Sequence, residues 1–136
     1  MELNDILRVA VKGNASDIHL KAGLPPLFRV DGALVPLKNG ERLQPEELTQ
    51  VMNDVMTQGQ RQRFDEHHEV DLAYSIAGLG RFRVNVFVQR GTIGVVFRVI
   101  PFGVKTIEQL DLPKVIEGLA MEPRGLILVT GTTGSG

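Results

Sequence analysis

The sequence predicts an α+β fold built around an antiparallel sheet with flanking helices. Three strand candidates, 70–76, 81–89 and 92–100, follow one another with only short turns between them. The helical stretches lie apart from these strands, at 3–11 and 45–56, and do not alternate with them. Neighbouring strands with helices set aside indicate α+β organisation and not a doubly wound parallel sheet.

The first element is predicted to be a short amphipathic helix that ends at Gly13-Asn14. Its apolar residues recur at helical spacing: Leu3, Ile6, Leu7, Ala10 and Val11. A helix of this kind could lie on a membrane surface, but Arg8 and Lys12 are its only basic residues. We therefore expect it to dock on its own domain.

A strand and a hairpin are predicted next. Residues 16–21 alternate in the manner of a half-buried strand, and 22–26 contain Gly and two Pro residues that force a turn. Segments 27–30 and 33–37 flank Asp31-Gly32, which is a strong signal for a two-residue hairpin turn. These segments are expected to pair with each other.

Two helices are predicted between this hairpin and the later strands. Pro45 suits the first turn of a helix over 45–56, and Gly59 is expected to end it. A second, polar helix is predicted over 60–68. It carries little apolar surface beyond Phe64.

A domain boundary is predicted at 101–113, because Pro101 to Lys105 interrupts the strand pattern. Short helices are expected over 106–108 and 113–120. The predicted division is an N-terminal domain over 1–100, a linker over 101–113 and the start of a second domain over 114–136.

The composition excludes several classes of function. Lys and Arg number 15 against 16 Asp and Glu, so no overall charge favours nucleic acid or an acidic membrane surface. No apolar run approaches the roughly 20 residues needed to cross a bilayer, and the first residues are acidic where a signal peptide would be basic. A cytoplasmic location without membrane insertion is expected. The absence of cysteine excludes disulfides and thiolate metal sites.

The last twelve residues are typical of a buried parallel strand that leads into a phosphate-binding loop. Leu126 to Val129 form a continuous apolar run. The six residues of the loop are Gly131, Thr132, Thr133, Gly134, Ser135 and Gly136. Gly131 and Gly136 match the two glycines of G-x-x-x-x-G-K-[ST], in which backbone N–H groups surround the phosphates. An ordinary Gly/Ser/Thr linker is the alternative.

The lysine of such a loop and the hydroxyl that holds Mg²⁺ would follow Gly136. We therefore expect these 136 residues to lack ATPase activity by themselves and to bind nucleotide weakly at best. No bound cofactor is expected. The apolar run 126–129 lacks the other strands of its sheet, so residues 121–136 are expected to be disordered or placed by a neighbouring molecule.

Two arginines on neighbouring strands form the second candidate site. Alternation over 81–88 places Phe82, Val84, Val86 and Val88 on one face and Arg81, Arg83 and Asn85 on the other. If Arg90-Gly91 forms a tight turn, Arg83 lies directly opposite Arg98 on the same face. Like charges placed in this way repel.

The repulsion between Arg83 and Arg98 has two interpretations. An anion supplied from elsewhere would relieve it, and planar guanidinium groups suit a phosphate. The alternative is that carboxylates such as Glu69 or Asp71 neutralise the pair within the domain. Spacing alone leaves both open.

No metal site is predicted. Asp17 and His19 alternate along one strand and are expected to share a face, but two ligands do not make a metal site. A structural polar pair is the expected role. His67-His68 point in different directions on a helix and are interpreted as a solvated helix end.

Several motifs, in order along nearly the whole chain, carry a resemblance to a known family. They are Ala15-Ser16-Asp17-Ile18-His19-Leu20, Gly23-Leu24-Pro25-Pro26, Phe28-Arg29-Val30-Asp31-Gly32, Gly80-Arg81-Phe82-Arg83-Val84-Asn85, Val96-Phe97-Arg98-Val99-Ile100-Pro101 and Pro123-Arg124-Gly125-Leu126-Ile127-Leu128-Val129-Thr130-Gly131. In these motifs the chain resembles the type IV pilus retraction ATPases (PilT-like) of the type II/IV secretion ATPase superfamily. Thr132 stands where Pro is common in these loops, a change expected to be tolerated.

The resemblance implies a PAS-like N-terminal domain, a linker, and the first strand and phosphate loop of a RecA-like α/β motor domain. It implies a homo-hexamer that uses ATP and Mg²⁺ and moves its N-terminal domains against its motor domains. The work would extract pilin subunits through an inner-membrane platform protein, which places the motor in the cytoplasm, peripheral to the inner membrane. Arg83 and Arg98 match the two arginines of this family that approach the nucleotide γ-phosphate, which makes them the catalytic candidates.

The resemblance leaves alternatives within and outside the family. A pilus assembly or type II secretion ATPase of the same superfamily is one alternative, although a chain that starts directly at this domain resembles the retraction motors more. The other alternative is a non-catalytic PAS-like module that docks a partner or senses a small ligand.

Overall fold

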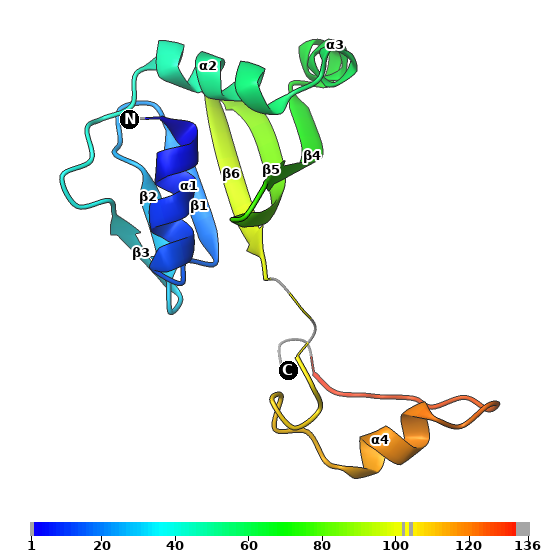
Figure 1. Cartoon of the computed structure of the whole chain (residues 1–136). Coiled ribbons are helices and arrows are strands. Elements are labelled where there is room, and N and C mark those ends of the chain that lie inside the picture. Colours follow the sequence, from blue (N-terminus) through cyan, green and yellow to red (C-terminus); the bar gives the residue numbers. More distant parts are fainter. Residues whose placement is uncertain (1, 102, 104, 133–136) are drawn as a thin grey trace. The chain divides into compact units, whose positions relative to one another are not determined.

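The computed structural model describes residues 2–101, 103 and 105–132 (Figure 1). It divides into two compact units, 1–102 and 103–136, and each is described by itself. The helices of the first unit are α1 (Leu3–Lys12), α2 (Pro45–Val55) and α3 (Gln58–His67). Its strands are β1 (Asp17–Lys21), β2 (Leu27–Val30), β3 (Ala33–Pro36), β4 (Glu69–Ile76), β5 (Gly80–Gln89) and β6 (Thr92–Ile100).

The six strands of the first unit form one sheet in the order β3-β2-β1-β6-β5-β4, and every neighbouring pair is antiparallel. The prediction of an α+β fold with an antiparallel sheet is confirmed. Strand β1 lies between β2 and β6 although β6 is more than 70 residues further along the chain. This order joins the N-terminal hairpin to the β5-β6 hairpin that carries Arg83 and Arg98.

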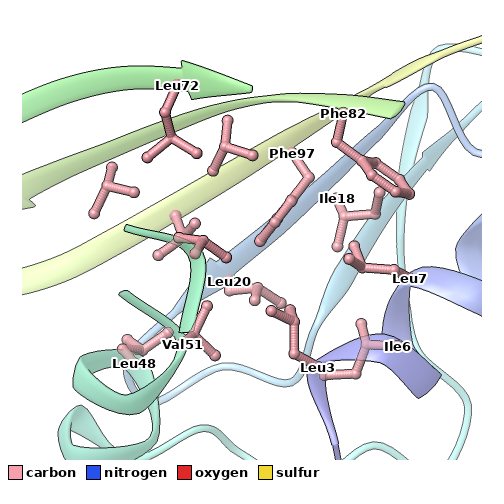
Figure 2. Close-up of a cluster of buried hydrophobic side chains, with 14 of the residues drawn as sticks. Leu3, Ile6, Leu7, Ile18, Leu20, Leu48, Val51, Leu72, Phe82 and Phe97 are labelled. Carbon is pink, nitrogen blue, oxygen red and sulfur yellow. The ribbon is translucent and has the colours of Figure 1, made fainter. Parts of the chain in front are cut away.

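The core lies on one face of the sheet, where the three helices bury their apolar residues. Figure 2 shows side chains of α1 and α2 facing those of the strands. The labelled residues are Leu3, Ile6, Leu7, Ile18, Leu20, Leu48, Val51, Leu72, Phe82 and Phe97. Phe82 and Phe97 are fully buried and meet edge to face with ring centroids 6.2 Å apart. Burial of each such side chain contributes about 1.5–3 kcal/mol to the stability of the fold. The helices are therefore held on the sheet by their apolar contacts with this face.

Both predicted hairpin turns are present. Asp31 and Gly32 have φ angles of 48° and 82°, and Arg90 and Gly91 have 52° and 76°. Two successive residues with positive φ are the pattern of the tight turn that matches the twist of paired strands. The second turn sets the register that places Arg83 opposite Arg98, as predicted.

The junction between the second and third helices differs from the prediction. Helix α2 ends at Val55, and Gly59 lies inside the first turn of α3, so the prediction that Gly59 ends a helix was wrong. Thr57 starts α3 instead. Its backbone N–H donates to Gln60 Oε1 at 2.8 Å, while its hydroxyl accepts from the Gln60 N–H at 3.4 Å. This capping box satisfies the backbone N–H groups of Thr57 and Gln60, which have no partner within the helix.

Val88 is a second, smaller difference. It was predicted on the buried face of β5 with Val84 and Val86, which are fully buried, but its side chain is 40% exposed. It lies next to the β5-β6 turn, near the end of the strand, where less of the core covers the sheet. Alternation fixes the side of a strand on which a residue lies, but not how much protein covers it.

The described residues of the second unit form one helix, α4 (Val115–Ala120), within the predicted range of 113–120. The helix predicted over 106–108 is absent. In its place is a turn in which the Thr106 N–H donates to Gln109 Oε1 at 2.9 Å and the Gln109 N–H donates to Thr106 Oγ1 at 3.1 Å. These bonds close one turn, which ends at Asp111, where φ is 54°.

The strand predicted over Leu126 to Val129 is also absent from the described structure. These side chains are exposed, with values of 82% at Leu126 and 95% at Val129. A strand forms only against a neighbouring strand that satisfies its backbone groups, and the described residues supply none here. The described residues therefore do not show the RecA-like part implied by the resemblance, and the boundaries at 101–113 and 114 remain predictions.

Candidate anion site on the open face of the sheet

Arg83 and Arg98 form the centre of the site. They are opposed on β5 and β6, and both project from the face opposite to the helices. Their side chains are 68% and 69% exposed. With Asn85 and Val96 they line a shallow pocket of about 130 Å³. Two cationic side chains thus border one small open space.

Carboxylates of β4 lie beside Arg83, as the second interpretation of the pair proposed. Arg83 Nη2 is 3.8 Å from Asp71 Oδ2, and both side chains are more than half exposed. An exposed ion pair of this length contributes about 0–1 kcal/mol. Glu69 accepts a hydrogen bond from the Asn85 amide at 2.9 Å, and Asp71 accepts a longer one from it at 3.4 Å. Arg83 is therefore only weakly held within the domain.

Arg98 has a stronger partner, which the sequence did not reveal. Its Nε donates to Asp17 Oδ1 at 2.9 Å. Asp17 lies on β1 directly opposite Arg98, because β1 pairs with β6. Sequence reasoning assigned Asp17 to a polar pair with His19, since nothing in the spacing shows which strand lies beside β1. The alternating pattern of 16–21 placed Asp17 on a strand, and that was the available signal.

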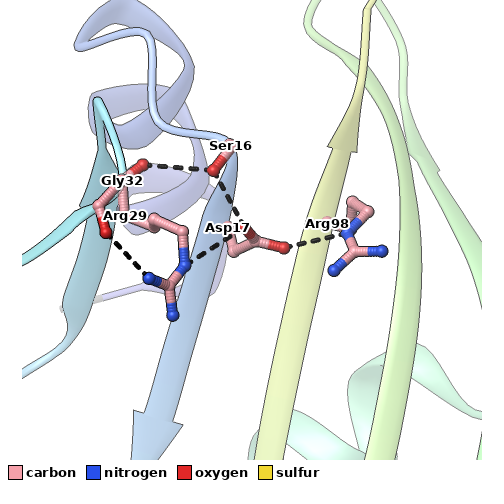
Figure 3. A network of polar contacts seen from close by, with 5 residues as sticks. All are labelled: Ser16, Asp17, Arg29, Gly32 and Arg98. Carbon is pink, nitrogen blue, oxygen red and sulfur yellow. Dashed lines mark hydrogen bonds and ion pairs between the residues drawn. The ribbon is translucent and has the colours of Figure 1, made fainter. Parts of the chain in front are cut away.

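Asp17 is the centre of a network that spans three strands (Figure 3). Ser16 Oγ donates to its second oxygen, Oδ2, at 2.8 Å, and Arg29 Nε lies 3.6 Å from the same oxygen. Arg29 Nη1 in turn donates to the Gly32 carbonyl at 2.9 Å. Burial raises the pKa of Asp17, but hydrogen bonds from Arg98 and Ser16 outweigh it, so the net pKa is lowered. The carboxylate is ionised at neutral pH.

His19 shares the open face with Asp17, as predicted, but the expected polar pair is not formed by a hydrogen bond. Among the described residues, the buried His19 Nε2 has no hydrogen-bond partner. Burial and the nearby Arg29 lower the pKa of His19, and Asp17 opposes this only in part. His19 is therefore neutral at pH 7.

The adjacent histidines and the predicted phosphate loop are the remaining features predicted from the sequence. His67 is exposed near Glu66, and His68 closes α3 with a φ of 59°, which agrees with a solvated helix end. Gly131 and Thr132 are exposed, irregular chain in the second unit, and Thr133, Gly134, Ser135 and Gly136 lie outside the described residues. The phosphate loop stays a prediction.

Among the described residues, no three His, Asp or Glu side chains gather where they could hold a metal ion. No helix in the described part of the chain has both the length and the apolar character needed to cross a membrane.

The comparisons with known proteins fit this fold. Over all 136 residues, the chain is 43% identical to the type IV pilus retraction ATPase PilT and 40% identical to the type IV pilus ATPase PilU, both from Pseudomonas aeruginosa. The chain is a homologue of the PilT-type pilus ATPases. It spans 39% of the length of PilT and 35% of that of PilU. No protein-family model matches the chain.

Solved structures give the same result. A crystal structure of the pilus retraction motor PilT with bound ADP matches 98% of the chain with a TM-score of 0.87 at 40% identity, and the match covers 39% of that PilT chain. The Legionella pneumophila ATPase DotB matches 97% of the chain with a TM-score of 0.74 at 27% identity, over 38% of DotB. The predicted resemblance to PilT-like secretion ATPases is confirmed, and the fold matches the N-terminal domain of PilT.

Proposed function

We propose that this chain is the N-terminal part of a hexameric motor that hydrolyses ATP, with Mg²⁺, to power retraction of type IV pili. The observation that carries the proposal is the identity of 43% with a pilus retraction ATPase over every residue of the chain. A related retraction motor has been crystallised with ADP. The motor would work in the cytoplasm at the inner membrane, on a platform protein of the pilus base.

The proposed task of this domain is to bring Arg83 and Arg98 to the γ-phosphate of the nucleotide. Phosphoryl transfer spreads negative charge over three equatorial oxygens, and guanidinium groups placed there stabilise the transition state. Support comes from the geometry of the pair. The two side chains are opposed, more than two-thirds exposed and open toward one shallow pocket. A phosphate between them would replace repulsion by attraction.

The test uses a chain that continues through the complete ATPase domain. Arg83→Ala and Arg98→Ala should each lower kcat for ATP by about 10³-fold, the lower end of the effect of an arginine in phosphoryl transfer. Nucleotide Kd should change much less, because the loop backbone supplies most of the binding. Arg81→Ala is the matched control, since Arg81 is exposed on the same face of β5 two residues from Arg83 and faces Ile100. Wild-type turnover in both arginine variants would refute the role.

The 136 residues by themselves are proposed to be inactive, because they contain no lysine in the loop position. Purified chain incubated with ATP and Mg²⁺ should release no phosphate beyond background. Multiple-turnover hydrolysis that follows the chain through successive purification steps would contradict this.

A second candidate function is a docking or sensing module without a catalytic role. It is favoured by one observation: the described residues of the first unit form a hydrophobic core of their own, from Leu3 to Phe97. Under this alternative, partner binding would survive removal of 101–136, and adding the unit to an isolated motor domain would not alter turnover. A pilus assembly or secretion motor of the same superfamily would instead restore assembly or secretion, and not retraction, to a deletion strain.

A further inference from the structure

We propose that Asp17 is a positioning residue for Arg98. It holds the guanidinium group by its Nε edge and leaves the terminal Nη groups to meet an anion in the pocket beside Arg83. The inference deepens the proposed function and rests on it, because it assigns how one of the two proposed γ-phosphate ligands is oriented.

Arg98 is bound within the domain through its Nε atom. In the described part of the chain, the only hydrogen bond that Arg98 donates from its side chain runs from Nε to Asp17 Oδ1, at 2.9 Å (Figure 3). Among the described residues no hydrogen bond involves Arg98 Nη1 or Nη2. A guanidinium group has five N–H donors in a fixed plane, so one bond at Nε orients the other four without using them. Arg98 therefore keeps its bidentate edge for a phosphate.

The Asp17 carboxylate is itself held in a fixed position. Asp17 is 6% exposed and lies on β1, which is paired on both sides in the sheet. Its Oδ2 accepts from Ser16 Oγ at 2.8 Å and faces Arg29 Nε at 3.6 Å. Arg29 is tied to the Gly32 carbonyl of the β2-β3 turn. Both carboxylate oxygens are thus occupied from opposite sides, which fixes the carboxylate plane and with it the direction of Arg98.

The ion pair of Arg83 is longer and more exposed than that of Arg98. Its carboxylate neighbour, Asp71, is 3.8 Å away and 55% exposed, while Asp17 contacts Arg98 at 2.9 Å with a side chain 9% exposed. One buried carboxylate also faces two guanidinium groups, those of Arg29 and Arg98, and so leaves positive charge unbalanced there. Asp17 orients Arg98 without cancelling the charge that attracts an anion.

The kinetic test uses the chain with its complete ATPase domain. Asp17→Asn should lower kcat by roughly 10- to 100-fold, the range for a misplaced catalytic group or a lost orienting partner. Asp71→Asn, the matched control, should lower kcat by at most about fivefold, since the exposed pair it breaks is weak. In an Arg98→Ala background, Asp17→Asn should have almost no further effect, because the residue that it orients is absent.

A spectroscopic test is independent of catalysis. In the 136-residue chain, the Arg98 Nε–H should give a resolved NMR signal that exchanges slowly with water. Asp17→Asn should abolish this slow exchange while the amide signals of the sheet remain, and Asp71→Asn should preserve it. A rapidly exchanging Arg98 Nε–H in the wild-type chain would overturn the inference.

The kinetic outcomes separate this inference from the proposed function. If Arg98→Ala keeps wild-type kcat, the proposed catalytic role of Arg98 fails, and the NMR signal still decides whether Asp17 orients Arg98. If Arg98→Ala is impaired but Asp17→Asn is not, the inference fails and the function stands. A rise in kcat in Asp17→Asn would also overturn the inference, since it would show that Asp17 competes with the phosphate for Arg98.

Discussion

At Asp17, burial and hydrogen bonding act on one carboxylate in opposite directions. Burial raises its pKa, and the bonds from Arg98 and Ser16 lower it by more. The ionised form is therefore favoured in the folded chain relative to the unfolded chain. A carboxylate with a lowered pKa stabilises the fold above its unfolded pKa of about 3.9, and this stabilisation is lost as the pH falls through the lower, folded value.

The first prediction concerns the substitution Asp17→Asn in the 136-residue chain. At pH 7 it should lower the free energy of unfolding by about 1.5–3 kcal/mol, the range for hydrogen bonds to a charged group. Below about pH 4 the difference from the wild type should shrink as the pH falls toward the lowered folded pKa, because the wild-type carboxylate is progressively protonated. Urea unfolding at a series of pH values measures this. A difference that stays constant down to pH 2 would show that the charge of Asp17 contributes nothing.

His19 supplies the second prediction, in a higher pH range. Its pKa is lowered by burial first and then by Arg29, so the folded chain favours the neutral ring. The unfolding free energy should therefore decline as the pH falls below the unfolded pKa of about 6.5 and on through the folded value. His19→Gln should remove this part of the decline, which unfolding curves between pH 7 and about 5 would detect. Equal slopes in the two proteins would contradict the assignment.

At the scale of elements, two glycines play opposite parts. Gly59 lies in the first turn of α3, has no positive φ, and has nothing within 4 Å of an added Cβ. Gly32 also has open space around it, but its φ is +82° in the β2-β3 turn. Both positions have room for a methyl group. The backbone conformation accepts one at Gly59 but not at Gly32.

The third prediction follows from this contrast. Gly59→Ala should raise the free energy of unfolding by up to about 1 kcal/mol, through better helix propensity and a less flexible unfolded chain. Gly32→Ala should lower it by about 1–2 kcal/mol, the cost of a left-handed conformation for a residue with a Cβ. Urea midpoints of the two variants against the wild type measure both. Destabilisation by Gly59→Ala would show that α3 needs glycine in its first turn.

The elements themselves were predictable where the signal is local. Alternation located the strands of the β5-β6 hairpin, and Arg90-Gly91 set the register that opposes Arg83 and Arg98. The start of α3 was missed because two side chains, Thr57 and Gln60, satisfy the helix end reciprocally and move it ahead of Gly59. The apolar run 126–129 has a strand pattern, but pattern alone does not make a strand without a neighbour to pair with.

At the scale of the whole chain, the first unit should fold without the second. The described residues of the first unit form a hydrophobic core of their own, which runs from Leu3 to Phe97. The fourth prediction is that a chain ending at residue 102 unfolds cooperatively, with a midpoint temperature within a few degrees of that of the 136-residue chain. Calorimetry of both chains is the measurement. Loss of the cooperative transition on truncation would show that 103–136 stabilise the fold.

The fold class, the hairpin turns and the opposition of Arg83 and Arg98 could be predicted from the amino-acid sequence, because each depends on residues close together in the chain. The sequence motifs also identified the PilT-like relatives, which the comparisons confirmed. The hydrogen bond from Arg98 to Asp17, 81 residues away, and the ion pair of the same carboxylate with Arg29 became apparent only in the folded chain. These contacts depend on strand order: β1 enters the sheet beside β6, and contacts between strands that are distant in sequence leave no periodic signal in either one.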